Sequence, residues 1–121
     1  MKKYLLLVLI LLQIACKNNQ STSVVAPTPV SVAAGKQLFE TNNCNACHQI
    51  AEKVVGPSLQ TIAQIYKAKN ANIISFLKAE AEPIVDPSQY ASMKLNLEIT
   101  KTMSNNEIKS LELYILSQAK Q

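Results

Sequence analysis

The sequence contains no arginine and no tryptophan, and His48 is its only histidine. Arginine makes paired hydrogen bonds to phosphate and to guanine, so its absence in a chain with a formal charge of only +4 argues against a nucleic-acid partner. The chain also has only two phenylalanines. Because a small domain with few large side chains has little to fill its core, a large apolar cofactor would supply the missing volume.

The chemistry is concentrated in a C-x-x-C-H run at residues 44–48. Two thiols three residues apart can form thioethers with the two vinyl groups of one porphyrin, while the imidazole that follows coordinates the iron. The run therefore predicts a covalent haem c on Cys44 and Cys47, with His48 as an axial ligand. Since the chain has no second histidine, the other axial ligand is a methionine, a weaker ligand or none.

A C-x-x-C pair also occurs in thioredoxin-like dithiols, zinc sites and disulfides. A structural zinc site needs four ligands, and only His48 and Cys16 remain as candidates. A thioredoxin-like dithiol follows a β-strand, whereas the residues before Cys44 have a helical pattern. A dithiol or plain disulfide stays open as the alternative to haem.

The first residues resemble a bacterial lipoprotein signal. Lys2 and Lys3 precede an apolar stretch at residues 4–12, and Ala15 precedes Cys16. This order predicts a signal peptide at 1–15 that is cleaved before a lipid-modified Cys16, although Gln13 departs from the usual pattern. An uncleaved anchor is the alternative, but the stretch is shorter than the roughly 20 residues that span a bilayer. The protein is then expected at the cell membrane or outer membrane, with its domain in the periplasm or at the surface.

The remaining chain divides into a linker and one domain. Residues 16–31 are polar, contain Pro27 and Pro29, and predict a flexible tether. Residues 32–121 predict an all-α domain of three to four helices packed around the haem. Helical patterns cover about 32–41, 58–66, 72–81 and 104–118, while Pro83 is expected to stop the third helix and the region of Pro87 to be a loop.

The last of these helices has the clearest start. Ser104 and Glu107 form an S-x-x-E capping box, and Met103 and Ile108 occupy the positions of a hydrophobic staple. The sequence thus predicts that Met103 already has a structural role beside its own helix.

The domain resembles the small bacterial class I cytochromes c. The residues that match the order of that family are Gly35, Phe39, Cys44, Cys47, His48, Gly56, Pro57, Leu111 and Tyr114. The resemblance implies the cytochrome c fold, in which the first and last helices cross closely at the glycine. It also implies that the carbonyl of Pro57 accepts a hydrogen bond from His48. The implied function is transfer of single electrons between a redox protein donor and acceptor, without enzyme activity.

Met93 is the expected sixth ligand of the iron, because it precedes the last helix at nearly the spacing that the family shows. It is expected to lie in an irregular stretch after Tyr90. If Met93 stays off the metal, a haem enzyme or a gas or redox sensor with an open sixth site is the alternative, and a structural subunit with an incidental haem is a third. Lys53, Lys94 and Lys101 either steer an acidic partner to the haem edge or are an ordinary solvated surface.

Overall fold

The computed structural model describes residues 29–120. The expected signal peptide, Cys16 and nearly all of the expected linker lie outside the described residues, so the predicted domain boundaries stay predictions. Residues 29–120 form five α-helices and two short 3-10 turns: α2 (Val32–Thr41), η1 (Cys44–Ala46), α3 (Leu59–Ala68), α4 (Ile73–Leu77), η2 (Pro87–Gln89), α5 (Tyr90–Thr100) and α6 (Asn105–Ser117). Since this part of the chain contains helices and no strand, the predicted all-α class is confirmed. None of these helices is long and apolar enough to cross a bilayer.

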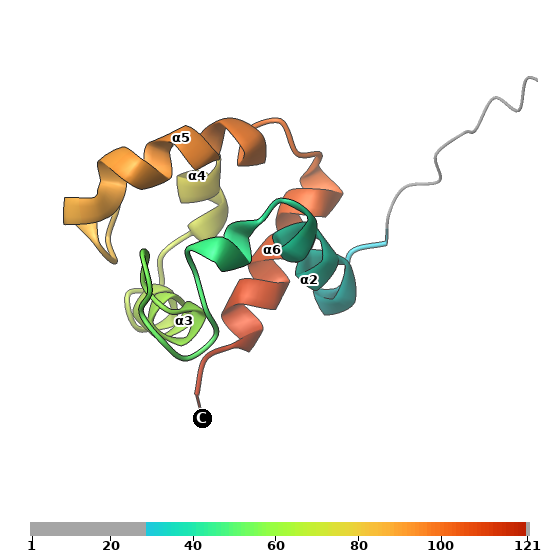
Figure 1. Cartoon of the computed structure of the whole chain (residues 1–121). Coiled ribbons are helices and arrows are strands. Elements are labelled where there is room, and N and C mark those ends of the chain that lie inside the picture. Colours follow the sequence, from blue (N-terminus) through green and yellow to red (C-terminus); the bar gives the residue numbers. More distant parts are fainter. Residues whose placement is uncertain (1–28, 121) are drawn as a thin grey trace, which may run out of the picture.

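The first and last helices of the domain cross in contact with each other (Figure 1). Gly35 is buried at the crossing, where an added Cβ would lie 1.9 Å from the backbone oxygen of Ser110. One turn further along, the rings of Phe39 and Tyr114 pack with their centroids 5.4 Å apart. Ser31 caps α2, because its Oγ accepts a hydrogen bond from the backbone of Ala34 at 3.0 Å. A glycine and a cap thus let α2 dock closely on α6.

Helix α6 begins at the predicted capping box. The backbone N–H of Glu107 donates to Ser104 Oγ at 3.4 Å, and the backbone N–H of Ser104 donates to Glu107 Oε2 at 2.7 Å. The hydrogen bond from Ser104 also lowers the pKa of Glu107. A cap of this kind stabilises a helix by about 1 kcal/mol. Behind it, Ile108 and Leu111 are buried in the core, and Met103 packs against the same cluster.

Two elements differ from the sequence-based expectation. Helix α4 ends at Leu77 rather than near Pro83, because Ala79 takes a left-handed conformation with φ 58°. The backbone N–H groups of Ala79 and Glu80 then cap the last carbonyls, those of Phe76 and Ser75, at 2.9 and 2.8 Å. This pattern of two backbone hydrogen bonds ends a helix without the need for a proline.

The expectation of an irregular stretch after Tyr90 is wrong, because residues 90–100 form α5. This helix raises the number above the predicted three to four. Its apolar side chains are not confined to one stripe: Leu97 is buried, whereas Leu95 is 77% exposed and Ile99 is 42% exposed. A helix without an apolar stripe gives no periodic signal in the sequence.

Helix α5 lies across the end of the domain, beside α4 (Figure 1). Near its C-terminal end, the buried Thr100 donates from Oγ1 to the carbonyl of Leu77 at 2.5 Å. At its start, the ring of Tyr90 packs against that of Phe76 with centroids 6.2 Å apart. The helix thereby forms one wall of a pocket whose opposite wall is the segment that follows α2.

Candidate cofactor site

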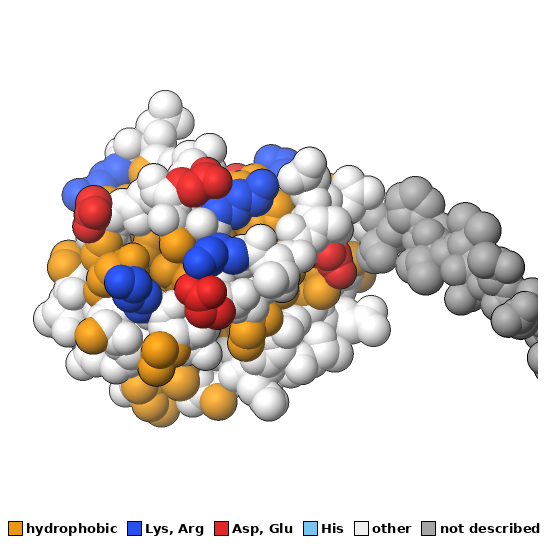
Figure 2. Space-filling model, turned by 90° about the horizontal axis from the view of Figure 1, so that it is seen from above, with side chains coloured by type: hydrophobic (Ala, Val, Ile, Leu, Met, Phe, Trp, Pro, Cys, Tyr) orange, Lys and Arg blue, Asp and Glu red, His pale blue; other side chains and the backbone are white. Residues whose placement is uncertain are grey.

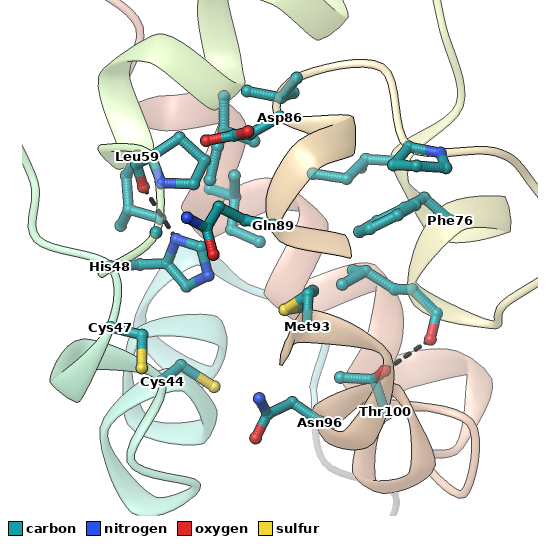
Figure 3. Close-up of a pocket in the computed structure, with 18 of the residues that line it drawn as sticks. Cys44, Cys47, His48, Leu59, Phe76, Asp86, Gln89, Met93, Asn96 and Thr100 are labelled. Atoms are coloured by element: carbon teal, nitrogen blue, oxygen red, sulfur yellow. Dashed lines mark hydrogen bonds between the residues drawn. The ribbon is translucent and has the colours of Figure 1, made fainter. Parts of the chain in front are cut away.

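The C-x-x-C-H run lies on a tight turn between α2 and the pocket. Asn43, which lies between the C-cap of α2 and the start of η1, takes a left-handed conformation with φ 55°. In η1, the backbone N–H groups of Cys47 and His48 both donate to the carbonyl of Cys44, at 3.2 and 3.0 Å. The turn brings both cysteines and the histidine to the same edge of the pocket (Figure 3).

Both thiols of the run are free in the structure. Burial raises the pKa of the Cys44 thiol, with a smaller contribution in the same direction from Cys47. The thiol of Cys44 therefore stays protonated at neutral pH in the protein before any bond is made to it. The two sulfurs are positioned as a pair at the pocket edge and are not joined to each other.

The ring of His48 is oriented by two neighbours in the following loop. His48 Nδ1 lies 2.8 Å from the backbone oxygen of Pro57. Because a carbonyl only accepts, Nδ1 carries the proton and Nε2 keeps its lone pair for a metal. Gly56 packs against the ring so closely that an added Cβ would lie 2.4 Å from His48 Cε1. The sequence pattern included Gly56 but did not reveal this contact with the imidazole.

Met93 enters the pocket from the opposite side. It lies one turn into α5, is half-buried, and its sulfur points toward the side on which His48 and the cysteines lie (Figure 3). Met103 is not among the lining residues and instead packs against the core. Of the two methionines in residues 29–120, only Met93 therefore faces the pocket. Asn96, one turn further along α5, also lines it and was not expected from the sequence.

The walls between these two sides are mostly apolar and come from all five helices of residues 29–120. They include Phe39, Leu59, Ile62, Ile73, Leu77, Ile99, Leu111 and Ile115. Tyr66 also lines the pocket, and burial raises its pKa to about 12, so its hydroxyl stays neutral. A pocket lined mostly by apolar side chains suits a flat hydrophobic ligand, and Asp86 is the acidic side chain among its lining residues.

The donor set fits haem c. Two thiols at the edge, an imidazole nitrogen on one side and a thioether sulfur on the other are the groups that attach this cofactor and ligate its iron. No cluster of three or more histidine, cysteine or acidic side chains suited to a metal ion occurs within residues 29–120. That part of the chain therefore offers no ligand set for a structural zinc ion.

The lysines that were candidates for steering are not a uniform positive patch. Lys53 pairs with Asp86, and Lys101 pairs with Glu98, each at 2.9 Å. Figure 2 shows lysines, acidic side chains and hydrophobic side chains interspersed on one face. Because opposite charges alternate, this face produces little long-range attraction for a partner of either sign.

Comparisons with known proteins give a family match and several relatives of this sequence. The sequence profile of the family described as Cytochrome c matches residues 32–119. The chain is 44% identical over 41 residues to cytochrome c-551 of Ectopseudomonas mendocina, covering 34% of this chain and 45% of the relative. It is 51% identical over 37 residues to cytochrome c-552 of Nitrosomonas europaea, covering 31% of this chain and 36% of the relative.

A third relative matches over more of its length. Cytochrome c-551 of Pseudomonas denitrificans is 28% identical over 75 residues, which are 60% of this chain and 92% of the relative. With the first two relatives, by contrast, the chain matches less than half of their length.

Proposed function

Because the chain belongs to the cytochrome c family, whose cofactor is covalently bound haem c, we propose that it carries single electrons between a redox protein donor and acceptor. Cys44 and Cys47 would hold the haem through thioethers, and His48 and Met93 would ligate its iron. The observation that carries this proposal is the placement of Met93 across an apolar pocket from His48 (Figure 3). When bound, the haem supplies an iron that alternates between two oxidation states, and no substrate is turned over.

Residues next to His48 orient its ring and set which of its nitrogens can bind the iron. His48 Nδ1 donates to the backbone oxygen of Pro57 at a distance of 2.8 Å, which keeps Nε2 available and makes the imidazole a stronger ligand. Gly56 lets the ring pack closely against the backbone, because it has no Cβ. A methionine ligand in an apolar pocket raises the reduction potential. These features suit a carrier of moderate to high potential better than an open site for gas or substrate.

The two methionines provide the test of the ligand assignment. Met93→Ala is expected to abolish the methionine-to-iron charge-transfer absorption of the oxidised protein and to lower its reduction potential. Met103→Leu is the matched control, because a swap of similar volume in the core costs less than about 1.5 kcal/mol and should leave both properties unchanged. Optical spectra and potentiometric titration measure the two effects.

Three results would contradict the assignment. The opposite pattern would transfer the ligand role to Met103. If neither variant lost the absorption, the iron would have no methionine ligand. Rapid binding of small ligands by the wild-type protein would favour the enzyme or sensor with an open sixth site.

The location follows from the first residues, which lie outside the described part of the chain. The lipoprotein-like signal supports a lipid on Cys16 that holds the domain at the cell membrane or outer membrane, in the periplasm or at the surface. The polar segment up to residue 31, with its prolines, serves as the tether. A flexible coil of about this length would span on the order of 20 Å, enough to keep a small domain clear of the headgroups.

Cys16→Ser tests this anchoring. The variant is expected to lose the lipid and to leave the membrane fraction, whereas Ser21→Ala in the same segment should behave like the wild type. Mass spectrometry of the N-terminus and cell fractionation measure the two properties. A Cys16→Ser protein that is still processed and membrane-bound would show that lipid is not the anchor, and an uncleaved apolar segment would replace it.

A further inference from the structure

A single ion pair joins the two sides of the pocket. Lys53 Nζ lies 2.9 Å from Asp86 Oδ2, although the residues are 33 apart in the sequence. Lys53 belongs to the loop after the C-x-x-C-H run, and its backbone forms an isolated antiparallel bridge with His48. Asp86 directly precedes η2, which leads into α5 and Met93. The pair thus connects the backbone of one expected ligand to the segment that carries the other.

Asp86 is held more firmly than a typical surface carboxylate. Its side chain is only 16% exposed, against 62% for Lys53. Its second oxygen, Oδ1, accepts a hydrogen bond from Ser88 Oγ at 2.6 Å. The hydrogen bonds from Ser88 and then from Lys53 lower the pKa of Asp86, so the carboxylate stays charged at neutral pH. Because the acceptor is already fixed, forming the pair costs the side-chain entropy of Lys53 and little from Asp86.

The start of α5 has few other attachments. Its buried residues are Leu97 and Thr100, both in the C-terminal half. Thr100 ties that half to α4 through the carbonyl of Leu77. The half that carries Met93 contains no buried residue, and there the half-buried Tyr90 stacks on Phe76. An added attachment at Asp86 therefore acts on the end of α5 that is most free to move.

We propose that Lys53 and Asp86 form a latch that keeps the Met93-bearing end of α5 closed over the pocket and so makes Met93 harder to displace from the iron. Both are positioning residues: Asp86 lines the pocket at its edge, Lys53 does not line it, and neither is an expected ligand of the iron. The inference rests on the proposed ligation by Met93. Its size is limited by the exposure of Lys53: a surface pair changes an equilibrium by up to about fivefold.

The test uses competition for the iron in the oxidised holoprotein. Imidazole is titrated while the methionine-to-iron charge-transfer absorption is followed, because imidazole binds only when Met93 has left. Lys53→Gln and Asp86→Asn should each bind imidazole about three- to fivefold more tightly than the wild type, and the double variant no more tightly than either single one. Asp86→Asn keeps an oxygen for Ser88. Lys101→Gln, which removes the pair with Glu98 at the other end of α5, is the matched control and should match the wild type.

Salt gives a second readout that general destabilisation would not produce. At about 1 M salt, where the screening length is about 3 Å, imidazole affinity should rise in the wild type and stay constant in Lys53→Gln. Wild-type affinity in both single variants, or effects that simply add in the double variant, would overturn the latch while Met93 remains the ligand. A wild-type protein without the methionine absorption would overturn the ligation by Met93 and the latch together.

Discussion

Serine at both Cys44 and Cys47 is expected to make all of the haem extractable, whereas none leaves the wild-type protein. A hydroxyl forms no thioether with a vinyl group, so the cofactor would be held only by the imidazole of His48, the thioether of Met93 and the apolar walls of the pocket. The thiols already lie side by side at the pocket edge. Denaturation in acid followed by extraction with organic solvent measures the effect.

The single variants provide the control for this experiment. Cys44→Ser or Cys47→Ser keeps one thioether, and one covalent bond is enough to hold the haem on the denatured chain. Only the double variant should release it. The double variant should also unfold at a lower temperature as it is diluted, because a cofactor bound without a covalent bond stabilises a protein according to its concentration. Release of haem from the wild type would show that Cys44 and Cys47 are a dithiol or disulfide.

Alanine at Gly35 is expected to lower the free energy of unfolding by about 3 kcal/mol or more. Its Cβ would lie 1.9 Å from the oxygen of Ser110 and 2.8 Å from the Cβ of Tyr114. The first of these is a backbone atom of α6 and has no alternative rotamer. The two helices would therefore have to move apart along their whole crossing, which costs more than ordinary overpacking of a core. Denaturant unfolding of the holoprotein followed by circular dichroism measures the change.

The sign of this effect is decisive. Intrinsic helix propensity favours alanine over glycine by about 1 kcal/mol. If Gly35 were exposed, its replacement by alanine would therefore raise the free energy of unfolding. Ala33→Gly is the control, because Ala33 is exposed on the same helix and should lose only about 1 kcal/mol. A Gly35→Ala protein as stable as the wild type would show that α2 and α6 do not cross as closely as the structure has them.

The haem-attachment motif and the ends of two helices can be predicted from short stretches of sequence, because they depend only on residues that are neighbours in the chain. The spacing of two thiols and an imidazole at residues 44–48 predicts haem attachment through covalent reach alone. The bounds of α2 match the prediction, and α6 begins at the predicted capping box of Ser104 and Glu107. Caps act over three or four residues, so they need no knowledge of the rest of the chain.

Other features depend on which surfaces meet in three dimensions. Helix α5 lacks an apolar stripe, and it is stabilised by Thr100 bonding to Leu77, 23 residues away. For that reason its region was expected to be irregular, and Met93 was expected in a loop. The end of α4 depends on the left-handed conformation of Ala79. Alanine rarely adopts this conformation, so the sequence does not predict it.

The site itself shows the same division. The identities of its donors are in the sequence, but their orientation is set by partners from elsewhere in the chain. The packing of Gly56 on the ring of His48 and the pair between Lys53 and Asp86 have no local signature, because each requires the chain to fold back on itself. Local rules therefore predict which residues are candidates to bind the haem, while long-range packing decides where their side chains point.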